Sequence, residues 1–346
     1  RINSAQGAFP VLRAESKAAR SRRKRGQTMK ITLLEPLIIP DSVLDGYLDA
    51  LRAAGHTVCA FDTRSTDPAE LSRRIGDSDI AILGNTPLPG EVIRGAKNLK
   101  LLNVAFTGID HIDLAACREM GVTVCNAAGY STQCVAELAV GLAIACLRFV
   151  PQCDKAARTG GVGAPLRGRE IAGRTVGIVG TGAIGSRAAK LFSAFGARVI
   201  AYSRTEKPEL AAQGVEYVSL ETLMRESDLV SLHVPSNAQT RGLISRALLE
   251  SMKPTAVLIN TARGAVVDNA ALADCLNAGK LSAAGIDVFD MEPPIPQDYP
   301  LLHAKNTVLT PHVAFATDES MLRRAEIVFR NVDAFLAGKP ENVCKL

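Results

Sequence analysis

A glycine-rich string from Gly180 to Gly185, with the sequence GTGAIG, is the first feature of this chain that could bind a ligand. The string follows a short apolar run at 175–179 and leads into a run of helical character at 187–195. In such a unit the first glycine permits a tight turn, the second lets backbone amides approach a pyrophosphate, and the third lets helix and strand pack closely. The helix N-terminus then offers unpaired N–H groups to the phosphates. The string therefore predicts a dinucleotide site formed by Gly180, Gly182, Ala183, Ile184 and Gly185.

The end of the next apolar run, at 198–202, indicates which dinucleotide binds. Sites for NAD usually have an acidic residue here, which accepts hydrogen bonds from the adenosine ribose. Ser203 occupies that position in this chain, followed by Arg204 and Thr205. A guanidinium can pair with a 2′-phosphate. The pattern favours NADP(H) over NAD(H); the alternative is that Ser203 tolerates NAD and Arg204 stacks on adenine.

Three polar segments follow later apolar runs, at the strand ends where an open α/β sheet binds its ligands. The segment 260–264 reads Asn-Thr-Ala-Arg-Gly and contains Arg263. The segment 287–293 reads Asp-Val-Phe-Asp-Met-Glu-Pro and contains Glu292, and Thr-Pro-His at 310–312 contains His312. Taken singly, each of these side chains is more often a surface charge or an ordinary loop residue. Together they place a planar cation, a carboxylate and an imidazole at strand ends.

Short apolar runs that alternate with helical periodicity must position these segments, and such alternation predicts parallel sheets covered on both faces. In the first unit we expect a helix at 42–54 and strands at 31–34, 57–61, 80–83, 99–105 and 123–125. In the second unit we expect strands at 175–179, 198–202, 229–233, 257–260, 284–288 and 308–310. The chain should end with a helix at about 319–337.

The region at 132–149 is predicted to be one long helix, apolar nearly all round and therefore buried. The glycines and proline of 160–165 predict a loop. Because 346 residues exceed the usual size of one core, we expect two domains. We assign 128–313 to a dinucleotide-binding domain, and 29–127 together with 314–346 to a substrate domain.

The net charge of +5 is unevenly distributed. Residues 1–28 contain eight Lys or Arg and one Glu, a charge of +7, so the remainder carries 5 − 7 = −2. The basic run at 20–25 could bind nucleic acid or act as a targeting address. The abrupt beginning of a strand after Met29 favours Met29 as the true start, with 1–28 as a basic, disordered upstream extension. We therefore expect no nucleic-acid partner unless that extension is native.

Cysteine usage and hydropathy point to a cytoplasmic protein. The eight cysteines include no CxxC pair, which argues against a metal site and a disulfide framework and predicts reduced thiols. The first 28 residues lack the apolar core of a signal peptide. The longest apolar stretch, 135–147, is interrupted by Glu137 and is too short to cross a bilayer, so no membrane contact is expected.

In their order along the chain, the glycine string and the three polar segments resemble those of the D-isomer-specific 2-hydroxyacid dehydrogenase family. Its members include glyoxylate and hydroxypyruvate reductases, D-lactate dehydrogenases and phosphoglycerate dehydrogenases. The resemblance extends from about Met29 to the last residue. It implies a Rossmann-type doubly wound parallel sheet, a flavodoxin-like α/β substrate domain, and a homodimer formed through 132–149. It also implies hydride transfer between NAD(P)H and a small 2-oxo acid or D-2-hydroxy acid.

The resemblance assigns roles to the three polar side chains. Arg263 would bind the substrate carboxylate and its 2-oxygen, because a planar guanidinium matches two oxygens at once. His312 would be the general acid in reduction and the general base in oxidation. Glu292 would hydrogen-bond His312, fix its orientation and keep its imidazolium available.

Further positions match the ligand loops of the family. Thr107 and Gly108 fall in the loop whose backbone amides hold the substrate carboxylate, although the same segment also reads as a plain strand-to-helix turn. Asp287 would accept a hydrogen bond from the carboxamide of the cofactor. The remaining implied cofactor contacts are His233, Val234, Pro235, Thr261, Ala262 and Ala314. Cys134 would lie near the nicotinamide as a structural thiol.

Some features depart from the family pattern or leave alternatives open. Phe106 and Phe315 would give the pocket aromatic walls if both point inward, which favours an apolar substituent over a phosphate. A phosphite-type dehydrogenase on the same fold would keep a similar triad, whereas a formate enzyme is expected to carry Gln at position 292. A non-enzymatic, NAD(H)-sensing corepressor-like scaffold is the other alternative; such relatives tend to carry Trp near the histidine, and this chain has none.

Overall fold

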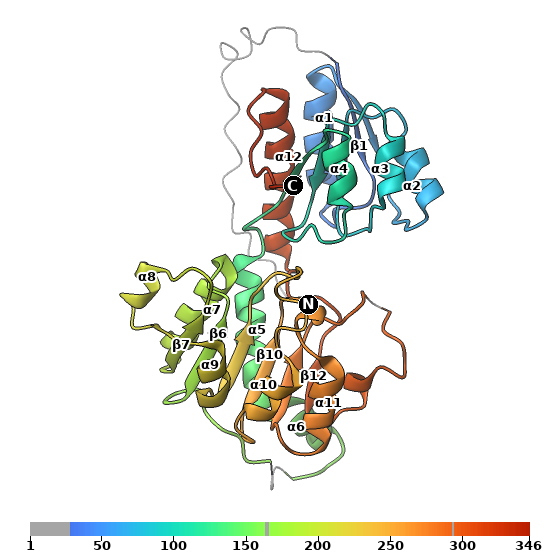
Figure 1. The fold of residues 1–346 in the computed structure, drawn as a ribbon. Helices are drawn as coiled ribbons and strands as arrows, with labels where there is room; N and C mark the ends of the chain where they lie inside the picture. The colour runs from blue at the N-terminus through green and yellow to red at the C-terminus, as the bar shows by residue number, and fades with distance from the viewer. Residues whose placement is uncertain (1–27, 163–165, 293) are drawn as a thin grey trace.

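The computed structural model describes residues 28–162, 166–292 and 294–346, which form two parallel β-sheets joined by a buried helix (Figure 1). The predicted basic extension lies outside the described residues except for Thr28, as do 163–165 of the predicted loop and residue 293. The strands predicted at 80–83, 175–179, 198–202 and 257–260 are confirmed to the residue, and the others shift by one or two residues at their ends.

The first sheet has the strand order β2-β1-β3-β4-β5, and all of its pairs are parallel. Its strands are β1 (Lys30–Leu33), β2 (Thr57–Ala60), β3 (Ile80–Leu83), β4 (Leu101–Val104) and β5 (Thr123–Asn126). This is the flavodoxin-like order, in which the direction of winding reverses between β1 and β3. Every residue of β3 and β4 is buried, as expected for strands covered on both faces.

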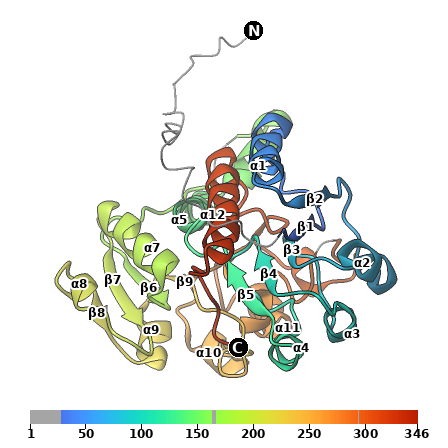
Figure 2. The same cartoon turned by 90° about the horizontal axis from the view of Figure 1, so that it is seen from above.

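Successive residues of these strands alternate between two apolar cores. Ala81 and Leu83 pack with α2 (Pro68–Ile75), α3 (Gly90–Gly95) and α4 (Leu114–Glu119), whereas Ile80 and Ile82 pack with α1 (Asp41–Ala53) and α12 (Asp318–Leu336). The last helix of the chain therefore covers the first sheet, as Figure 2 shows.

A buried amide network fixes α12 on the first sheet. Asn331 of α12 donates a hydrogen bond to the side-chain oxygen of Asn103 on β4 at 3.1 Å, and Asn103 donates to the carbonyl of Val328 at 2.8 Å. Both asparagines have no exposed surface. Because buried amides are costly without partners, this network defines one position for the helix.

The second sheet has the order β12-β11-β10-β9-β6-β7-β8, with every pair parallel and β6 where the winding reverses. Its strands are β6 (Thr175–Val179), β7 (Arg198–Tyr202), β8 (Glu216–Tyr217), β9 (Leu229–Leu232), β10 (Val257–Asn260), β11 (Ala283–Ile286) and β12 (Thr307–Leu309). The sequence analysis omitted β8, because its two residues form no apolar run. The expected pair of folds, Rossmann-type and flavodoxin-like, is confirmed.

Helices cover both faces of the second sheet. One core packs α5 (Thr132–Leu147) and α7 (Ala183–Ala194) on the sheet, and the other packs α9 (Leu220–Glu226), α10 (Arg246–Ser251) and α11 (Asn269–Asn277). The remaining elements are α6 (Val150–Arg158), α8 (Pro208–Ala211) and the 3-10 turns η2 (Gly264–Val266) and η3 (Pro300–Leu302).

The long apolar helix is buried as predicted but ends at Leu147 rather than at 149. Phe149 adopts a left-handed backbone conformation with φ of 53°, and α6 begins after it with Pro151 in its first turn. Pro151 has no amide N–H to donate to the carbonyl of Leu147, four residues earlier, so one regular helix cannot continue through this point. Within the described ranges no single helix has the length and apolar character to cross a membrane, although α5 and α6 pass that test as a bent pair.

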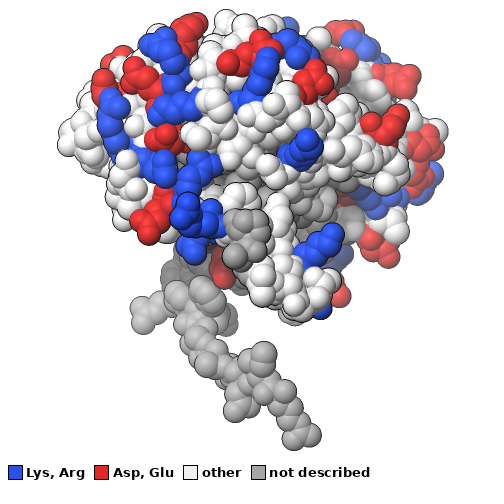
Figure 3. Space-filling view, turned by 90° about the horizontal axis from the view of Figure 1, so that it is seen from below, with Lys and Arg blue, Asp and Glu red and all other residues white. Residues whose placement is uncertain are grey.

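Acidic and basic side chains are interspersed over the face shown in Figure 3 rather than segregated by sign. This distribution is typical of a solvated protein surface.

Candidate active site

The glycine string forms the predicted turn between β6 and α7. Gly180 has φ of 92°, and a Cβ there would lie 2.7 Å from the carbonyl oxygen of His233. A Cβ on Gly185 would lie 1.8 Å from the carbonyl oxygen of Gly180, so the helix could not pack as closely on the turn. Gly182 differs from both, because a Cβ there would meet nothing within 4 Å. The second glycine therefore faces open space, where a ligand can approach its backbone.

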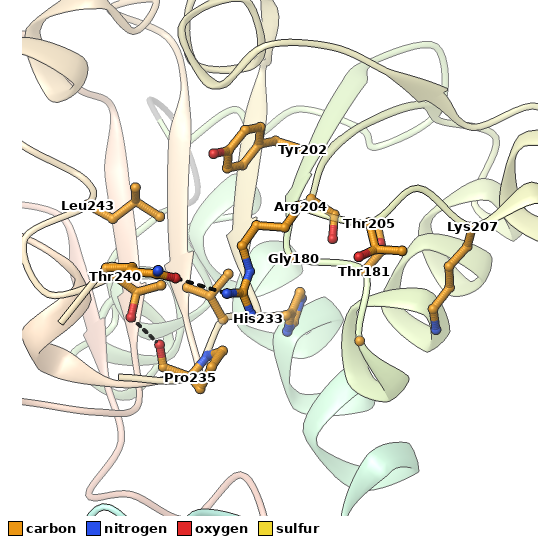
Figure 4. Close-up of a pocket in the computed structure, with 14 residues that line it drawn as sticks. Gly180, Thr181, Tyr202, Arg204, Thr205, Lys207, His233, Pro235, Thr240 and Leu243 are labelled. Atoms are coloured by element: carbon orange, nitrogen blue, oxygen red, sulfur yellow. Dashed lines mark hydrogen bonds between the residues drawn. The ribbon is translucent and has the colours of Figure 1, made fainter. Parts of the chain in front are cut away.

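A pocket adjoins this turn (Figure 4). It brings together eight residues predicted from the sequence, namely Gly180, Gly182, Ser203, Arg204, Thr205, His233, Val234 and Pro235. The sequence analysis missed the other residues that line it: Thr181, Tyr202, Lys207, Gln239, Thr240 and Leu243. Of these, only Lys207 had a signal in the sequence, as a second cation three residues after Arg204.

Two cations belong to this pocket and both are held by neighbours. The guanidinium of Arg204 donates to Gln239 Oε1 at 2.9 Å, and the ammonium of Lys207 donates to Ser186 Oγ at 3.1 Å, on the first turns of α7. The backbone amide of Lys207 donates to the hydroxyl of Tyr217 at 2.9 Å. No Asp or Glu is among the described residues that line the pocket. Its charge therefore suits an anion.

His233 provides an unpaired polar atom in the pocket wall. Its Nε2 lies 2.9 Å from Ser231 Oγ, while its buried Nδ1 has no partner among the described residues. Burial lowers the pKa of His233 to about 4, so the ring is neutral at neutral pH. The hydroxyl of Thr261, after β10, is likewise buried without a partner in the described part of the chain. Unpaired buried groups of this kind, together with the open approach to Gly182, fit a dinucleotide.

His312 lies beside Glu292, and the two side chains are hydrogen-bonded. The Nδ1 atom of His312 is 2.8 Å from Glu292 Oε2 and 3.0 Å from Oε1. The hydrogen bond from His312 holds the pKa of Glu292 below its ordinary value, and the charge of Arg263 acts in the same direction. The carboxylate therefore stays ionised and orients the ring, which leaves Nε2 for proton exchange.

The loop that carries His312 is fixed by a buried carboxylate. Asp287, with no exposed surface, accepts hydrogen bonds from Thr310 Oγ1 at 2.6 Å, from the Val313 amide at 2.9 Å and from the Ala314 amide at 3.0 Å. His312 itself has φ of 56°, a left-handed conformation that a residue with a side chain rarely adopts. A strained backbone held by surrounding bonds is typical of functional sites. The contact predicted between Asp287 and a cofactor carboxamide remains a prediction.

Arg263 extends from the second sheet toward the first. Asn260, at the end of β10, braces its turn by accepting from the Ala262 amide and donating to the Arg263 carbonyl, both at 3.0 Å. The Nη2 atom of Arg263 lies 1.8 Å from where a Cβ on Gly108 would stand. The guanidinium is therefore in contact with the backbone of the loop predicted to hold the substrate carboxylate. Thr107, next to Gly108, is exposed, and its carbonyl accepts from Asn126 at 2.8 Å.

Asp110 is a site residue that the sequence analysis did not single out. It forms an ion pair with Arg263 across the two sheets, with Nη2 to Oδ1 at 3.1 Å and Nε to both carboxylate oxygens at 3.3 Å. Burial raises the pKa of Asp110, but the charge of Arg263 and the hydrogen bonds to the carboxylate together outweigh burial, and the pKa is lowered overall. Its place two residues after Gly108 was visible in the sequence, but its partner Arg263 is 153 residues away.

Phe106 and Phe315 pack around His312. The ring centroid of Phe315 is 5.6 Å from that of His312 and 4.7 Å from that of Phe106, and both contacts are edge-to-face. A small cluster links this region to the cofactor side, because Ala314 and Phe315 pack with Ile184 and Cys134. Burial raises the pKa of the Cys134 thiol, in keeping with a structural role.

The predicted residues thus fall into two groups in the structure. Ser203, Arg204, Thr205 and His233 line the pocket of Figure 4. The other group follows the carboxyl ends of strands β4, β10, β11 and β12 and consists of Thr107, Gly108, Thr261, Ala262, Arg263, Asp287, Glu292, His312 and Ala314. Ala183, Ile184 and Gly185 form the first turn of α7 between the two.

Comparison with known proteins agrees with this geometry. Residues 140–314 match the model of the D-isomer specific 2-hydroxyacid dehydrogenase NAD binding domain. A hydroxypyruvate reductase of Blautia hydrogenotrophica is 35% identical over 318 residues, which cover 87% of this chain and 98% of that protein. A glyoxylate reductase of Thermofilum pendens is 41% identical over 278 residues, covering 78% of this chain and 82% of that protein. Among solved structures, an acyclic imino acid reductase in complex with NADPH and D-Arg superimposes with a TM-score of 0.83 at 32% identity, covering 92% of this chain and all of that one.

The fold and the two groups of site residues define a nicotinamide-dependent dehydrogenase with two α/β units. The chain belongs to the family of D-isomer specific 2-hydroxyacid dehydrogenases. It is therefore an oxidoreductase that transfers a hydride between a nicotinamide cofactor and a 2-oxo or 2-hydroxy acid.

Two glycine substitutions in the same string should have different effects. In Gly182→Ala the added methyl meets no protein atom, so the unfolding midpoint should stay within about 2 °C of wild type while the KM for the cofactor rises several-fold. In Gly185→Ala the methyl collides with the turn, so stability should fall by about 1–3 kcal/mol. Thermal unfolding and cofactor titration of both variants measure this, and equal loss of stability in the two would contradict the assignment of Gly182.

Proposed function

We propose that the chain is a reductase of small 2-oxo acids in which Arg263, Glu292 and His312 carry the chemistry. The observation that supports this most directly is the hydrogen bond of 2.8 Å between His312 Nδ1 and Glu292 Oε2. In addition, Arg263 contacts the Gly108 backbone at the edge where the strands of both sheets end. An isolated surface histidine would not also lie on a loop that is hydrogen-bonded to a buried carboxylate, as the His312 loop is to Asp287.

In this proposal Arg263 binds the carboxylate and the 2-oxygen of the substrate, with the backbone of Thr107 and Gly108 completing the carboxylate site. Its present partner, Asp110, then shares the guanidinium or gives way to the substrate carboxylate. His312 donates a proton from Nε2 to the 2-oxygen during reduction and removes it during oxidation. Glu292 stabilises the imidazolium and keeps the ring in place. A bound nicotinamide supplies or accepts the hydride.

The residues of the glycine turn would hold the dinucleotide. The N-terminus of α7, beginning at Ala183, offers its amides to the pyrophosphate, and His233 and Thr261 have polar atoms without protein partners on the cofactor side. We infer NADP(H) in preference to NAD(H), because Arg204 and Lys207 bring two positive charges to the ribose end and Ser203 replaces the usual acid. The solved relative that holds NADPH supports a nicotinamide cofactor without deciding this preference.

We further propose that the protein is a cytoplasmic homodimer, in which 29–127 with 314–346 form the substrate domain and 128–313 the dinucleotide domain. All eight cysteines are free thiols, which supports a reducing compartment. Much of α5 is buried within its own chain, so a dimer formed through this region would use the few exposed positions of α5 together with α6, which buries no residue. Light scattering at micromolar concentration should give twice the mass of the chain, and a monomer there would contradict the dimer.

His312→Ala should lower kcat by about 10²–10⁴-fold with little change in KM, because it removes the proton donor of the transition state. Arg263→Ala should harm both constants. His303→Ala is a matched control, since His303 is exposed and bonds only the Gln297 carbonyl in the described structure. Steady-state reduction assays of glyoxylate and hydroxypyruvate measure these effects, and an unchanged KM in Arg263→Ala would refute its assigned role.

The pH profile should report on Glu292. Its lowered pKa keeps the carboxylate charged at neutral pH and in more acidic solution than an ordinary glutamate, so the support that this charge gives to His312 is lost only as pH falls through that lowered pKa. In Glu292→Gln no carboxylate remains to titrate. The variant should therefore have a kcat at least about ten-fold lower at neutral pH and should lack the fall in kcat that the wild type shows in acid. Profiles of kcat that coincide in wild type and variant would remove Glu292 from the mechanism.

Arg204→Ala and Lys207→Ala should each raise the KM for NADPH by roughly ten-fold, because charge-assisted bonds to a phosphate contribute about 1.5–3 kcal/mol. The KM for NADH should change much less. Arg198→Ala is the control, since Arg198 lies at the opposite end of the same strand and pairs with Glu216. A wild-type enzyme with a higher kcat/KM for NADH than for NADPH would defeat the preference.

A further inference from the structure

The first sheet has a polar cluster at its carboxyl edge that the mechanism above does not use. Glu35, just after β1, is 5% exposed. Its Oε1 accepts from the Gly84 amide at 2.6 Å and the Thr86 amide at 3.1 Å, and its Oε2 accepts from Thr86 Oγ1 at 2.8 Å. Both partners follow β3, the strand beside β1. This is where the winding of the sheet reverses, and open α/β sheets bind ligands at such points.

Arg64 completes the cluster from the loop after β2. Its Nε donates to Thr86 Oγ1 at 3.0 Å and lies 3.5 Å from Glu35 Oε2, and its Nη2 reaches the Asn85 carbonyl at 3.4 Å. The side chain is 44% exposed, and within the described residues no acceptor is found for Nη1. One edge of the guanidinium is therefore held by protein while the other can meet a ligand.

A second, buried arginine fixes the loop that carries Arg64. Arg74 of α2 donates to the Leu34 carbonyl at 2.8 Å and to Thr63 Oγ1 at 3.0 Å, and it also bonds the Thr63 carbonyl. Arg74 is 8% exposed, so these bonds are shielded from water. Through Arg74, Thr63, which precedes Arg64, is thus held beside Leu34 at the end of β1. A preorganised guanidinium loses little entropy when it binds.

Contacts connect this cluster to the proposed reaction centre. His111 Nε2 lies 3.1 Å from the Gly84 carbonyl, and the adjacent Asp110 forms the ion pair with Arg263. Arg64 is also near enough to Glu292 for its charge to act on that carboxylate. Arg64 of the first sheet and Arg263 of the second therefore both lower the pKa of Glu292 through their charge.

We propose that Arg64, held by Glu35 and Thr86, is a specificity residue that binds an oxygen on the C3 substituent of the substrate. This inference rests on the proposed 2-oxo acid reduction. Because Glu35 offsets the charge of Arg64, the subsite suits a neutral hydroxyl better than a doubly charged phosphate. The substrate class is then the 3-hydroxy-2-oxo acids. The aromatic pair beside His312 alone would favour an apolar substituent, so the two features predict opposite preferences.

Three acids separate these possibilities: hydroxypyruvate carries the C3 hydroxyl, pyruvate lacks it, and glyoxylate has no C3. Wild-type kcat/KM should be higher for hydroxypyruvate than for pyruvate. In Arg64→Met, which keeps the length of the side chain but no N–H group, that ratio should fall about ten-fold or more. The kcat/KM for glyoxylate should stay within about two-fold of wild type. Arg73→Met is the matched control, because Arg73 is an exposed arginine of α2 that pairs with Glu70 and lies over the Phe61 ring, and no contact found among the described residues joins it to Glu35 or Thr86.

The outcomes are distinguishable. A selective loss on hydroxypyruvate, with Arg73→Met unchanged, supports the subsite. The subsite is overturned if Arg64→Met leaves the hydroxypyruvate-to-pyruvate ratio of kcat/KM unchanged, or if the wild type prefers pyruvate. It is also overturned if Arg64→Met lowers kcat/KM equally for all three acids, because Arg64 would then act on the shared reaction centre. A wild-type enzyme that reduces none of the three acids contradicts the proposed function itself, and the inference fails with it.

Discussion

The carboxylate of Asp287 is wholly buried and accepts three hydrogen bonds from the loop that carries His312. A buried carboxylate is tolerated only where hydrogen-bond donors surround it. Asp287 and the His312 loop therefore hold each other in position. Through these bonds His312 keeps a left-handed backbone and its ring remains beside Glu292. If the loop relaxed, the imidazole would lose its partner before any contact with substrate was made. The proposed catalytic set therefore depends on a residue that is not itself exposed to the substrate.

The site is assembled from both sheets, and this arrangement gives it a means of excluding water. Arg263 reaches from the second sheet to Gly108 and Asp110 of the first, while Phe106 and Phe315 cover the ring of His312. Where aromatic rings displace water, the interactions between the guanidinium, the imidazole and a bound anion become stronger. The last helix makes this possible, because α12 leaves the His312 loop and returns to the first sheet.

Two polar clusters with different charge balance serve different parts of the proposed reaction. At the glycine turn, Arg204 and Lys207 are not offset by any acidic residue among the described lining residues, which suits a phosphate. At the edge of the first sheet, Arg64 is offset by Glu35, which suits a neutral oxygen. An arginine thus favours a phosphate at the glycine turn and a neutral oxygen at the edge of the first sheet. The carboxylate of Glu35, which lies beside Arg64 only, accounts for the difference.

The sequence by itself determined those features that depend on neighbours along the chain. The glycine turn, the alternation of strands and helices and the polar strand ends are of this kind, since backbone sterics and periodicity act over a few residues. Only the tertiary structure decided the partners of distant groups: Asp110 for Arg263, Glu35 for Arg64, and the bonds that Asp287 makes to the His312 loop. It also decided where the long helix breaks, at Phe149. A hydrogen bond between residues 153 positions apart leaves no local pattern, because its geometry exists only after both sheets have packed.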